Sequence, residues 1–134
     1  MPSKNILETC FNNNSDGAGL MYVQNGQVII DKGYMDFKSF YKRIQKLERR
    51  LGDLTNKSIV MHFRIGTQGA NDKATTHPFP ISKDIEQLKA TYLKTDVGMV
   101  HNGIISKFNY DKSISDTQLF IKDFVSVIKN LKKD

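Results

Sequence analysis

Apolar positions follow two different periods in the first third of the chain. Ser3 can cap a short helix that ends near Asn13, because apolar residues recur there at helical spacing. The expected buried face of this helix holds Ile6, Leu7, Cys10 and Phe11. Two segments with strand-like alternation follow, Gly19 to Gln24 and Gln27 to Asp31, separated by Asn25-Gly26. An Asn-Gly pair between apolar runs predicts a two-residue hairpin, since both residues tolerate positive φ.

Two further helices are predicted by a 3.6-residue period that starts at a capping residue. Asp36 caps the first and Gly52 ends it. Its apolar stripe consists of Phe37, Phe40, Tyr41, Ile44, Leu47 and Leu51. The second opens at a capping box formed by Ser115 and Gln118. The residues expected to face inward from it are Leu119, Phe120, Phe124, Val127, Ile128 and Leu131.

The region between these two helices is expected to hold strands and a long loop. Ser58 to Arg64 is predicted as a buried strand, and Ile65 to Asp96 as a loop with a short helix around Ile85 to Ala90. The remaining predicted strands are Val97 to His101 and Ile104 to Ser106, separated by Asn102-Gly103. Paired strands without strict strand–helix alternation predict an α+β fold, in one domain over residues 1–134.

Composition limits the class of protein. Hydrophobic residues make up 39% of the chain and charged residues 25%, and no apolar run is long enough for a membrane helix. There is no apolar core of a signal peptide, and a single cysteine, Cys10, excludes an internal disulfide. These features predict a cytoplasmic protein in which Cys10 is a small core residue. Three histidines in separate segments do not form a zinc motif, so we expect no metal and no cofactor.

The chain is basic, with a formal net charge of +6 and a pI near 9.4. The positive residues cluster in two places, Lys38, Lys42, Arg43, Lys46, Arg49 and Arg50 in the first, and Lys129, Lys132 and Lys133 in the second. Such clusters are typical of nucleic-acid-binding surfaces and also of the solvated face of an ordinary helix. No nucleic-acid-binding motif accompanies them, so the solvated face is the favoured interpretation.

Three polar segments beside apolar strands contain candidate chemistry. They are HFRIGTQGA (His62 to Ala70), GMVHNGIIS (Gly98 to Ser106) and SDTQ (Ser115 to Gln118). Arg64 can bind a carboxylate as a bidentate fork, and Asp116 can bind an ammonium group. Asn102 and the Gly103 amide can stabilise an oxyanion. Together these groups predict a site for a zwitterionic ligand.

The same residues also have purely structural interpretations. Arg64 can form a surface ion pair, Asn102-Gly103 can be a hairpin turn, and Asp116 can complement a helix terminus. His62 and His101, in predicted strands, are interpreted as satisfied core histidines.

Four ordered motifs resemble those of class II glutamine amidotransferases, which are N-terminal-nucleophile hydrolases. They are HFRIGTQG, THPFPI, VHNGIIS and SDTQ, and the earlier segment SDGAGLMYVQNGQVIIDKGY is similar to short stand-alone members, several from phage genomes. The resemblance covers nearly the whole chain and implies a four-layer αββα sandwich. It implies that Arg64 binds the α-carboxylate of glutamine and Asp116 its α-amino group. It also implies an oxyanion hole formed by Asn102 and Gly103, and a pocket wall containing Thr67 and His77.

The chain departs from this family at two points. The family motif has histidine where this chain has Gln68, which can form hydrogen bonds but cannot carry charge. The family nucleophile is an N-terminal cysteine, whereas removal of Met1 would expose Pro2 here. The resemblance therefore implies a sandwich that lacks its first, nucleophile-bearing strand. We expect self-association or a protein partner to supply a strand at that position.

Three functions follow, in order of support. The first is a glutamine amidotransferase type 2-like domain that binds glutamine or a related amide and, without its nucleophile, does not hydrolyse it to glutamate and ammonia. The second is a non-catalytic phage or bacterial protein that binds and modulates a partner protein. The third is a basic nucleic-acid-binding module, which has the least support because no aromatic residues interleave with the charges.

Overall fold

A computed structural model describes residues 1–131 as a mixed α+β structure whose main sheet is antiparallel, with strand order β3-β1-β2-β5. Its strands are β1 (Ala18–Gln24), β2 (Gln27–Tyr34), β3 (Ile59–Phe63) and β5 (Tyr92–Thr95). The predicted hairpin of β1 and β2 is confirmed. Asn25 and Gly26 take φ angles of 51° and 74°, as a tight two-residue turn requires.

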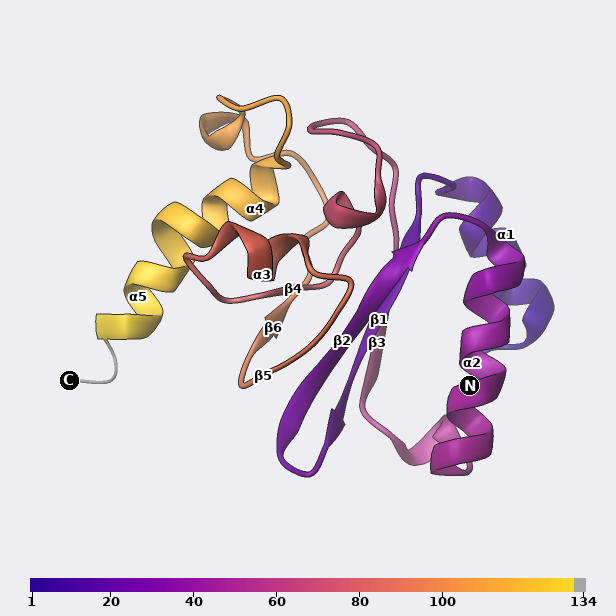
Figure 1. Cartoon of the computed structure of the whole chain (residues 1–134). Coiled ribbons are helices and arrows are strands. Elements are labelled where there is room, and N and C mark those ends of the chain that lie inside the picture. The colour runs from indigo at the N-terminus through magenta and orange to yellow at the C-terminus, as the bar shows by residue number, and fades with distance from the viewer. Residues whose placement is uncertain (132–134) are drawn as a thin grey trace.

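Two helices cover one face of this sheet (Figure 1). They are α1 (Lys4–Asn13) and α2 (Phe37–Leu51), which the side chains of Ser3 and Asp36 cap as predicted. The core between the helices and the sheet consists mainly of Phe11, Leu20, Tyr22, Ile29, Phe40, Ile44 and Leu47. Burying each such side chain stabilises the fold by about 1.5–3 kcal/mol. Two expectations on α1 need correction, because Ile6 is 56% exposed and Cys10 is only half-buried.

A layer of short elements lies on the other side of the main sheet (Figure 1). β4 (Phe79–Pro80) and β6 (Gly98–Met99) pair as a second, two-stranded antiparallel sheet. Gly98 lies close to the main sheet, since a Cβ atom there would be 2.5 Å from the sulfur of Met21. The short helix α3 (Ile85–Lys89), close to the predicted position, packs behind the small sheet. A second core there consists of Phe79, Ile81, Leu88 and Ile121.

The C-terminal helix begins at the predicted Ser115–Gln118 capping box but is not continuous. It runs as α4 (Asp116–Phe120), a π-helical turn (Ile121–Val125) and α5 (Ser126–Leu131). The wider i to i+5 turn shifts the phase of every later residue, so the predicted inward face is wrong beyond Leu119. Phe120 is half-buried, while Phe124, Val127, Ile128 and Leu131 are 50%, 39%, 40% and 70% exposed. Ile121 and Ser126 are buried instead.

The segment from Ile65 to Asp96 contains more regular structure than the predicted loop. It holds β4 and β5 in addition to α3, and a 3₁₀ turn at Lys73–Thr75. Strands of two and four residues are too short to show a readable alternation, which is why the pattern missed them. Downstream, the predicted strand Val97 to His101 shrinks to β6. Ile104 to Ser106 forms no strand, and a 3₁₀ turn at Ser106–Phe108 follows instead.

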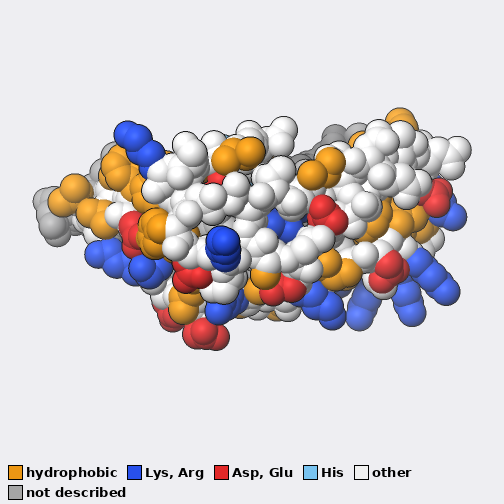
Figure 2. Space-filling model, turned by 90° about the horizontal axis from the view of Figure 1, so that it is seen from above, with side chains coloured by type: hydrophobic (Ala, Val, Ile, Leu, Met, Phe, Trp, Pro, Cys, Tyr) orange, Lys and Arg blue, Asp and Glu red, His pale blue; other side chains and the backbone are white. Residues whose placement is uncertain are grey.

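The cations of α2 lie on its outer side, and Figure 2 shows Lys and Arg side chains in a row along the α1 and α2 end of the molecule. Most of them are exposed, namely Lys38, Lys42, Lys46, Arg49 and Arg50, while Arg43 pairs with Asp31. Lys132 and Lys133 of the second cluster fall outside the described residues. Within residues 1–131, no helix combines the length and the apolarity that crossing a membrane requires.

Candidate functional site

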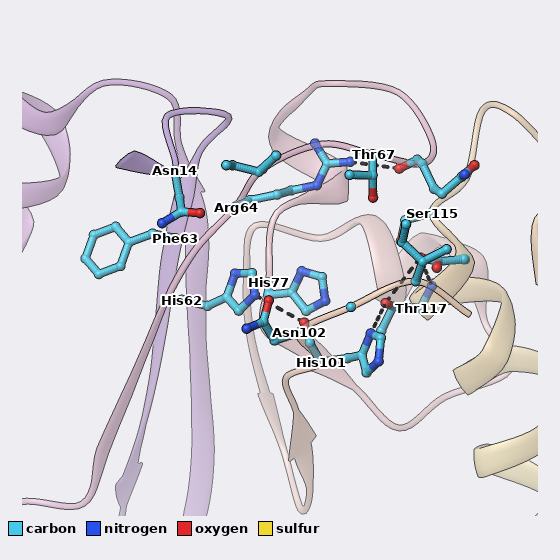
Figure 3. Close-up of a pocket in the computed structure, with 15 residues that line it drawn as sticks. Asn14, His62, Phe63, Arg64, Thr67, His77, His101, Asn102, Ser115 and Thr117 are labelled. Carbon is cyan, nitrogen blue, oxygen red and sulfur yellow. Dashed lines mark hydrogen bonds between the residues drawn. The ribbon is translucent and has the colours of Figure 1, made fainter. Parts of the chain in front are cut away.

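One cavity of about 350 Å³ brings the predicted site residues together (Figure 3). It lies between the end of β3, the segment after β6 and the start of α4. Its lining includes all six of them, Arg64, Thr67, His77, Asn102, Gly103 and Asp116. They come from four separate segments of the chain, so only the fold makes them neighbours.

Arg64 follows directly on β3 and is only 4% exposed. Its Nη1 donates to Oδ1 of Asn71 at 2.7 Å, and its Nη2 donates to the carbonyl oxygen of Gln68 at 2.8 Å. Because a guanidinium has five N–H donors, these two bonds leave others for a ligand. Within residues 1–131 the ion pairs are Arg43–Asp31 and Lys122–Asp123, and neither involves Arg64. The interpretation of Arg64 as a surface ion pair is therefore wrong.

Burial lowers the pKa of the Arg64 guanidinium, while the more distant carboxylates of Asp16, Asp72 and Asp116 oppose this shift. Asp16 supports Arg64 indirectly, since its Oδ1 accepts from Asn71 at 2.8 Å and its Oδ2 accepts from the Gly66 amide at 2.8 Å. These hydrogen bonds and the nearby charge of Arg64 hold the pKa of Asp16 below its usual value. An arginine side chain does not lose its proton under such conditions, so Arg64 stays cationic.

Asp116 lies across the cavity from Arg64, at the first residue of α4, and is 6% exposed. Its Oδ1 accepts from the amide of Thr117 at 2.7 Å, and its Oδ2 accepts from the amide of Ile105. No Lys or Arg of the described chain forms an ion pair with it. The Asp116 carboxylate thus accepts hydrogen bonds at a helix start, as its structural interpretation expects. Asp116 also lines the cavity, and it has no cationic ion-pair partner in residues 1–131.

A close backbone contact joins the two charged sides of the cavity. Gly69 has a φ of 81°, and a Cβ atom there would lie 2.8 Å from the backbone nitrogen of Ser115. Only glycine allows this approach, which holds the loop containing Thr67 and Gln68 against the start of α4. Asn102 and Gly103 lie at the exposed rim. The hairpin-turn interpretation of Asn102-Gly103 is wrong, because no strand follows them.

All three histidines line the same cavity. The rings of His62 and His77 stack at 4.2 Å and 21°, and Figure 3 shows them side by side. Nε2 of His62 lies 3.2 Å from the carbonyl oxygen of His101, and Nδ1 of His101 lies 3.3 Å from Oγ1 of Thr117. Burial, then the neighbouring His62 and Lys32, lowers the pKa of His77 to about 2, and burial also lowers the pKa of His62. The two stacked rings are therefore neutral at physiological pH.

His62 and His101 are the cavity residues that the sequence interpretation missed, whereas His77 was expected in the pocket wall. His62 and His101 were expected to be satisfied core residues, yet Nδ1 of His62 and both ring nitrogens of His77 are buried without a hydrogen-bond partner in residues 1–131. One sequence signal was present. His62 precedes Arg64 by two residues along a strand, and such residues point to the same side of a sheet.

The described part of the chain gives less support for a metal site or for a cysteine in the cavity. No group of three or more His, Cys, Asp or Glu side chains in residues 1–131 is arranged to hold a metal ion. Cys10 lies on α1, on the opposite face of the main sheet, and does not line the cavity. Comparison with known protein families, with curated proteins and with solved structures finds no match to this chain.

Proposed function

We propose that the cavity binds L-glutamine or a closely related amino acid amide, in the manner of a glutamine amidotransferase type 2-like domain. The observation behind this is one buried cation, Arg64, and one buried anion, Asp116, that share a cavity and have no ion-pair partner in residues 1–131. An unpaired buried charge costs several kcal/mol. A ligand that brings both counterions is therefore favoured, and an α-amino acid carries both on one carbon.

Each end of such a ligand has a matching group. The fork of Arg64 suits the α-carboxylate, because planar bidentate pairing is the strongest form of this contact. Asp116 suits the α-ammonium group, since its two backbone hydrogen bonds fix the carboxylate in place. Thr67, Asn102 and Gly103 line the open side of the cavity, where the resemblance to amidotransferases implies an oxyanion hole.

The arrangement of layers is consistent with the same proposal. α1 and α2, the main sheet, the β4–β6 sheet and the α3–α5 side follow one another in Figure 1, which resembles the αββα order of N-terminal-nucleophile hydrolases. The second sheet here has only two short strands.

We further propose that this chain binds the amide without hydrolysing it. No thiol lines the cavity, since the single cysteine of this sequence, Cys10, lies on α1. Nucleophilic hydrolysis of an amide needs an activated nucleophile within reach of its carbonyl carbon. An ammonia-release assay with glutamine should stay at background, and turnover that disappears in Arg64→Met would contradict this part of the proposal.

Titration calorimetry with L-glutamine tests binding directly. We expect binding at millimolar concentration or better, no binding of D-glutamine, and a loss of about tenfold or more in Asp116→Asn, which keeps the shape but removes the charge. Asp96→Asn, a change at an exposed aspartate outside the cavity, is the matched control. Absence of binding by the folded wild-type chain would rule out the proposal.

A second candidate, binding of a partner strand, is supported by an apolar groove of about 230 Å³ on the inner face of the main sheet. It is lined in part by Met21, Val28, Gly98 and two exposed valines, Val23 and Val60. Beside it, β6 pairs with β4 alone within residues 1–131, so no strand of the described chain occupies its other edge. We propose a second copy of this chain as the occupant. Light scattering should then show a concentration-dependent dimer that Val60→Lys abolishes, and a monomer at all concentrations would exclude it.

A further inference from the structure

Three buried ring nitrogens in the cavity have no explanation in the packing alone. They are Nδ1 of His62 and both nitrogens of His77, and none has a hydrogen-bond partner in residues 1–131. Buried polar atoms are almost always hydrogen-bonded, and leaving one unsatisfied costs about 1–3 kcal/mol. His77 is only 6% exposed, and it lines the cavity that a ligand can enter.

The donor and acceptor roles of these atoms follow from their surroundings. Nε2 of His62 faces the carbonyl oxygen of His101 at 3.2 Å, and a carbonyl only accepts, so this nitrogen carries the hydrogen. Nδ1 of His62 is then a free acceptor. His77 is neutral, because burial lowers its pKa to about 2, and a neutral imidazole has one donor and one acceptor. The stacked pair thus presents two acceptors and one donor.

We propose that His62 and His77 form the subsite for the side-chain carboxamide of the ligand, and that they select an amide over a carboxylate. A primary carboxamide can donate one N–H to Nδ1 of His62 and bond to one nitrogen of His77, through its second N–H or its carbonyl oxygen, while the other nitrogen of His77 points away. A carboxylate has no donor and would face the lone pair of Nδ1 of His62. In the unliganded chain both rings are neutral near neutral pH, since burial lowers both pKa values.

Selectivity of this kind follows a known asymmetry. A site built to hydrogen-bond a polar group rejects analogues that lack it, because its own buried atoms stay unpaired. This subsite rests on the proposed function, since Arg64 and Asp116 must hold the amino acid end while His62 and His77 read the other end. Neither histidine takes part in holding the α-carboxylate or the α-ammonium group.

Calorimetry with three ligands separates the two proposals. L-Glutamine, L-glutamate and L-norleucine share the amino acid end and differ at the tip of the side chain. We expect the wild-type chain to bind glutamine at least about tenfold more tightly than either of the others, the effect of one to two lost hydrogen bonds. If none of the three binds, the proposed function is wrong and this subsite falls with it. If glutamine and norleucine bind equally, only the carboxamide role is wrong.

Variants at His77 supply the second test. In His77→Leu the preference for glutamine over norleucine should fall to within about threefold, while norleucine itself still binds and so reports an intact cavity. His77→Asn, which keeps one donor group and one acceptor, should restore part of the preference. Tyr92→Leu, at an exposed aromatic residue on β5, is the matched control and should keep the wild-type ratio. An unchanged ratio in His77→Leu would overturn the assignment.

Should His77→Leu fail to fold, His77→Asn decides by itself. Its single amide replaces a ring that stacks on His62 and meets Phe79 edge-on at 4.6 Å, so it retains polarity without the ring geometry. We then expect a preference between that of the wild type and none. A wild-type preference in that variant would exclude the ring nitrogens as its source.

Discussion

Two buried cations, Arg64 and Lys32, both lie close enough to His77 to contribute to its lowered pKa. Arg64 is 4% exposed and Lys32 is 3% exposed, and neither is in an ion pair within residues 1–131. Lys32 on β2 donates from Nζ to the carbonyl oxygens of Leu88 at 2.9 Å and Ala74 at 3.3 Å, and it lies 3.9 Å above the ring of Phe79. Arg64 borders the cavity, whereas Lys32 does not.

The two residues solve the problem of a buried charge in different ways. Burial lowers the pKa of Lys32 to about 7, so its charge can disappear, and a neutral amine has two N–H groups for its two carbonyl acceptors. An arginine side chain does not lose its proton in this way, so its charge remains. The charge of Arg64 persists in a low-dielectric site until an anion arrives. The comparison favours a structural role for Lys32 and, under the proposed function, a ligand-binding role for Arg64.

The largest expected effect comes from removing the persistent charge. Arg64→Met should weaken glutamine binding by at least about 100-fold, roughly 3 kcal/mol, because the ligand carboxylate loses its only cationic partner. The unliganded protein should be as stable as wild type or more stable, since a buried unpaired charge is replaced by a side chain of similar length. Calorimetry and thermal unfolding by circular dichroism measure the two effects.

Arg49→Met is the control for that experiment, because Arg49 is exposed on α2 and far from the cavity lining. Arg49→Met should change neither the affinity for glutamine nor the stability of the unliganded protein. A marked fall in stability for Arg64→Met, with glutamine binding retained, would show that Arg64 has the structural role assigned here to Lys32 and would reverse the comparison.

The next effect concerns Lys32 and pH. Its pKa is about 7 in the folded state against 10.5 in the unfolded chain, so between these values the unfolded chain binds a proton that the folded one does not. The Lys32 contribution to the free energy of unfolding should therefore rise with pH, by up to about 1.4 kcal/mol per unit across this window. Below pH 7 both states are protonated and the contribution is flat.

Urea unfolding of wild type and Lys32→Met at pH 7, 8 and 9 isolates this contribution as a difference between the two curves. The variant should fold, because Nε2 of Gln118 donates to the same carbonyls, at 3.1 Å for Ala74 and 3.2 Å for Leu88. Lys94→Met, at an exposed lysine on β5, should keep the wild-type slope. Parallel curves for wild type and Lys32→Met would mean that Lys32 keeps its charge in the fold.

The contrast between Arg64 and Lys32 also shows what a sequence can reveal. Arg64 was found because it ends a strand inside a polar, glycine-containing motif, and Asn25-Gly26 set the hairpin through local φ preferences. Lys32 lies just beyond the predicted strand Gln27 to Asp31, and no sequence pattern there indicates its burial. Its environment depends on the carbonyls of Ala74 and Leu88, which no local period encodes.

Other misses have the same physical origin. β5 is a strand because it pairs with β2 across a long stretch of chain, and four residues carry too little pattern to predict it. The π turn at Ile121–Val125 shifts a helical stripe that was otherwise readable. The stack of His62 on His77 joins two segments whose histidines look unrelated in the sequence. Local capping and turn chemistry is thus predictable, whereas pairing between distant segments is not.

The smallest expected effect tests how Arg64 is held. The guanidinium bonds to the backbone carbonyl of Gln68 and to the side chain of Asn71, not to the side chain of Gln68. Gln68→Ala should therefore change glutamine affinity by less than about twofold, although Gln68 stands where the amidotransferase motif has histidine. Asn71→Ala removes a bond to a charged group and should cost about tenfold. Calorimetry on both variants decides between backbone and side-chain support, because a larger loss in Gln68→Ala than in Asn71→Ala would place the side chain of Gln68 on the ligand itself.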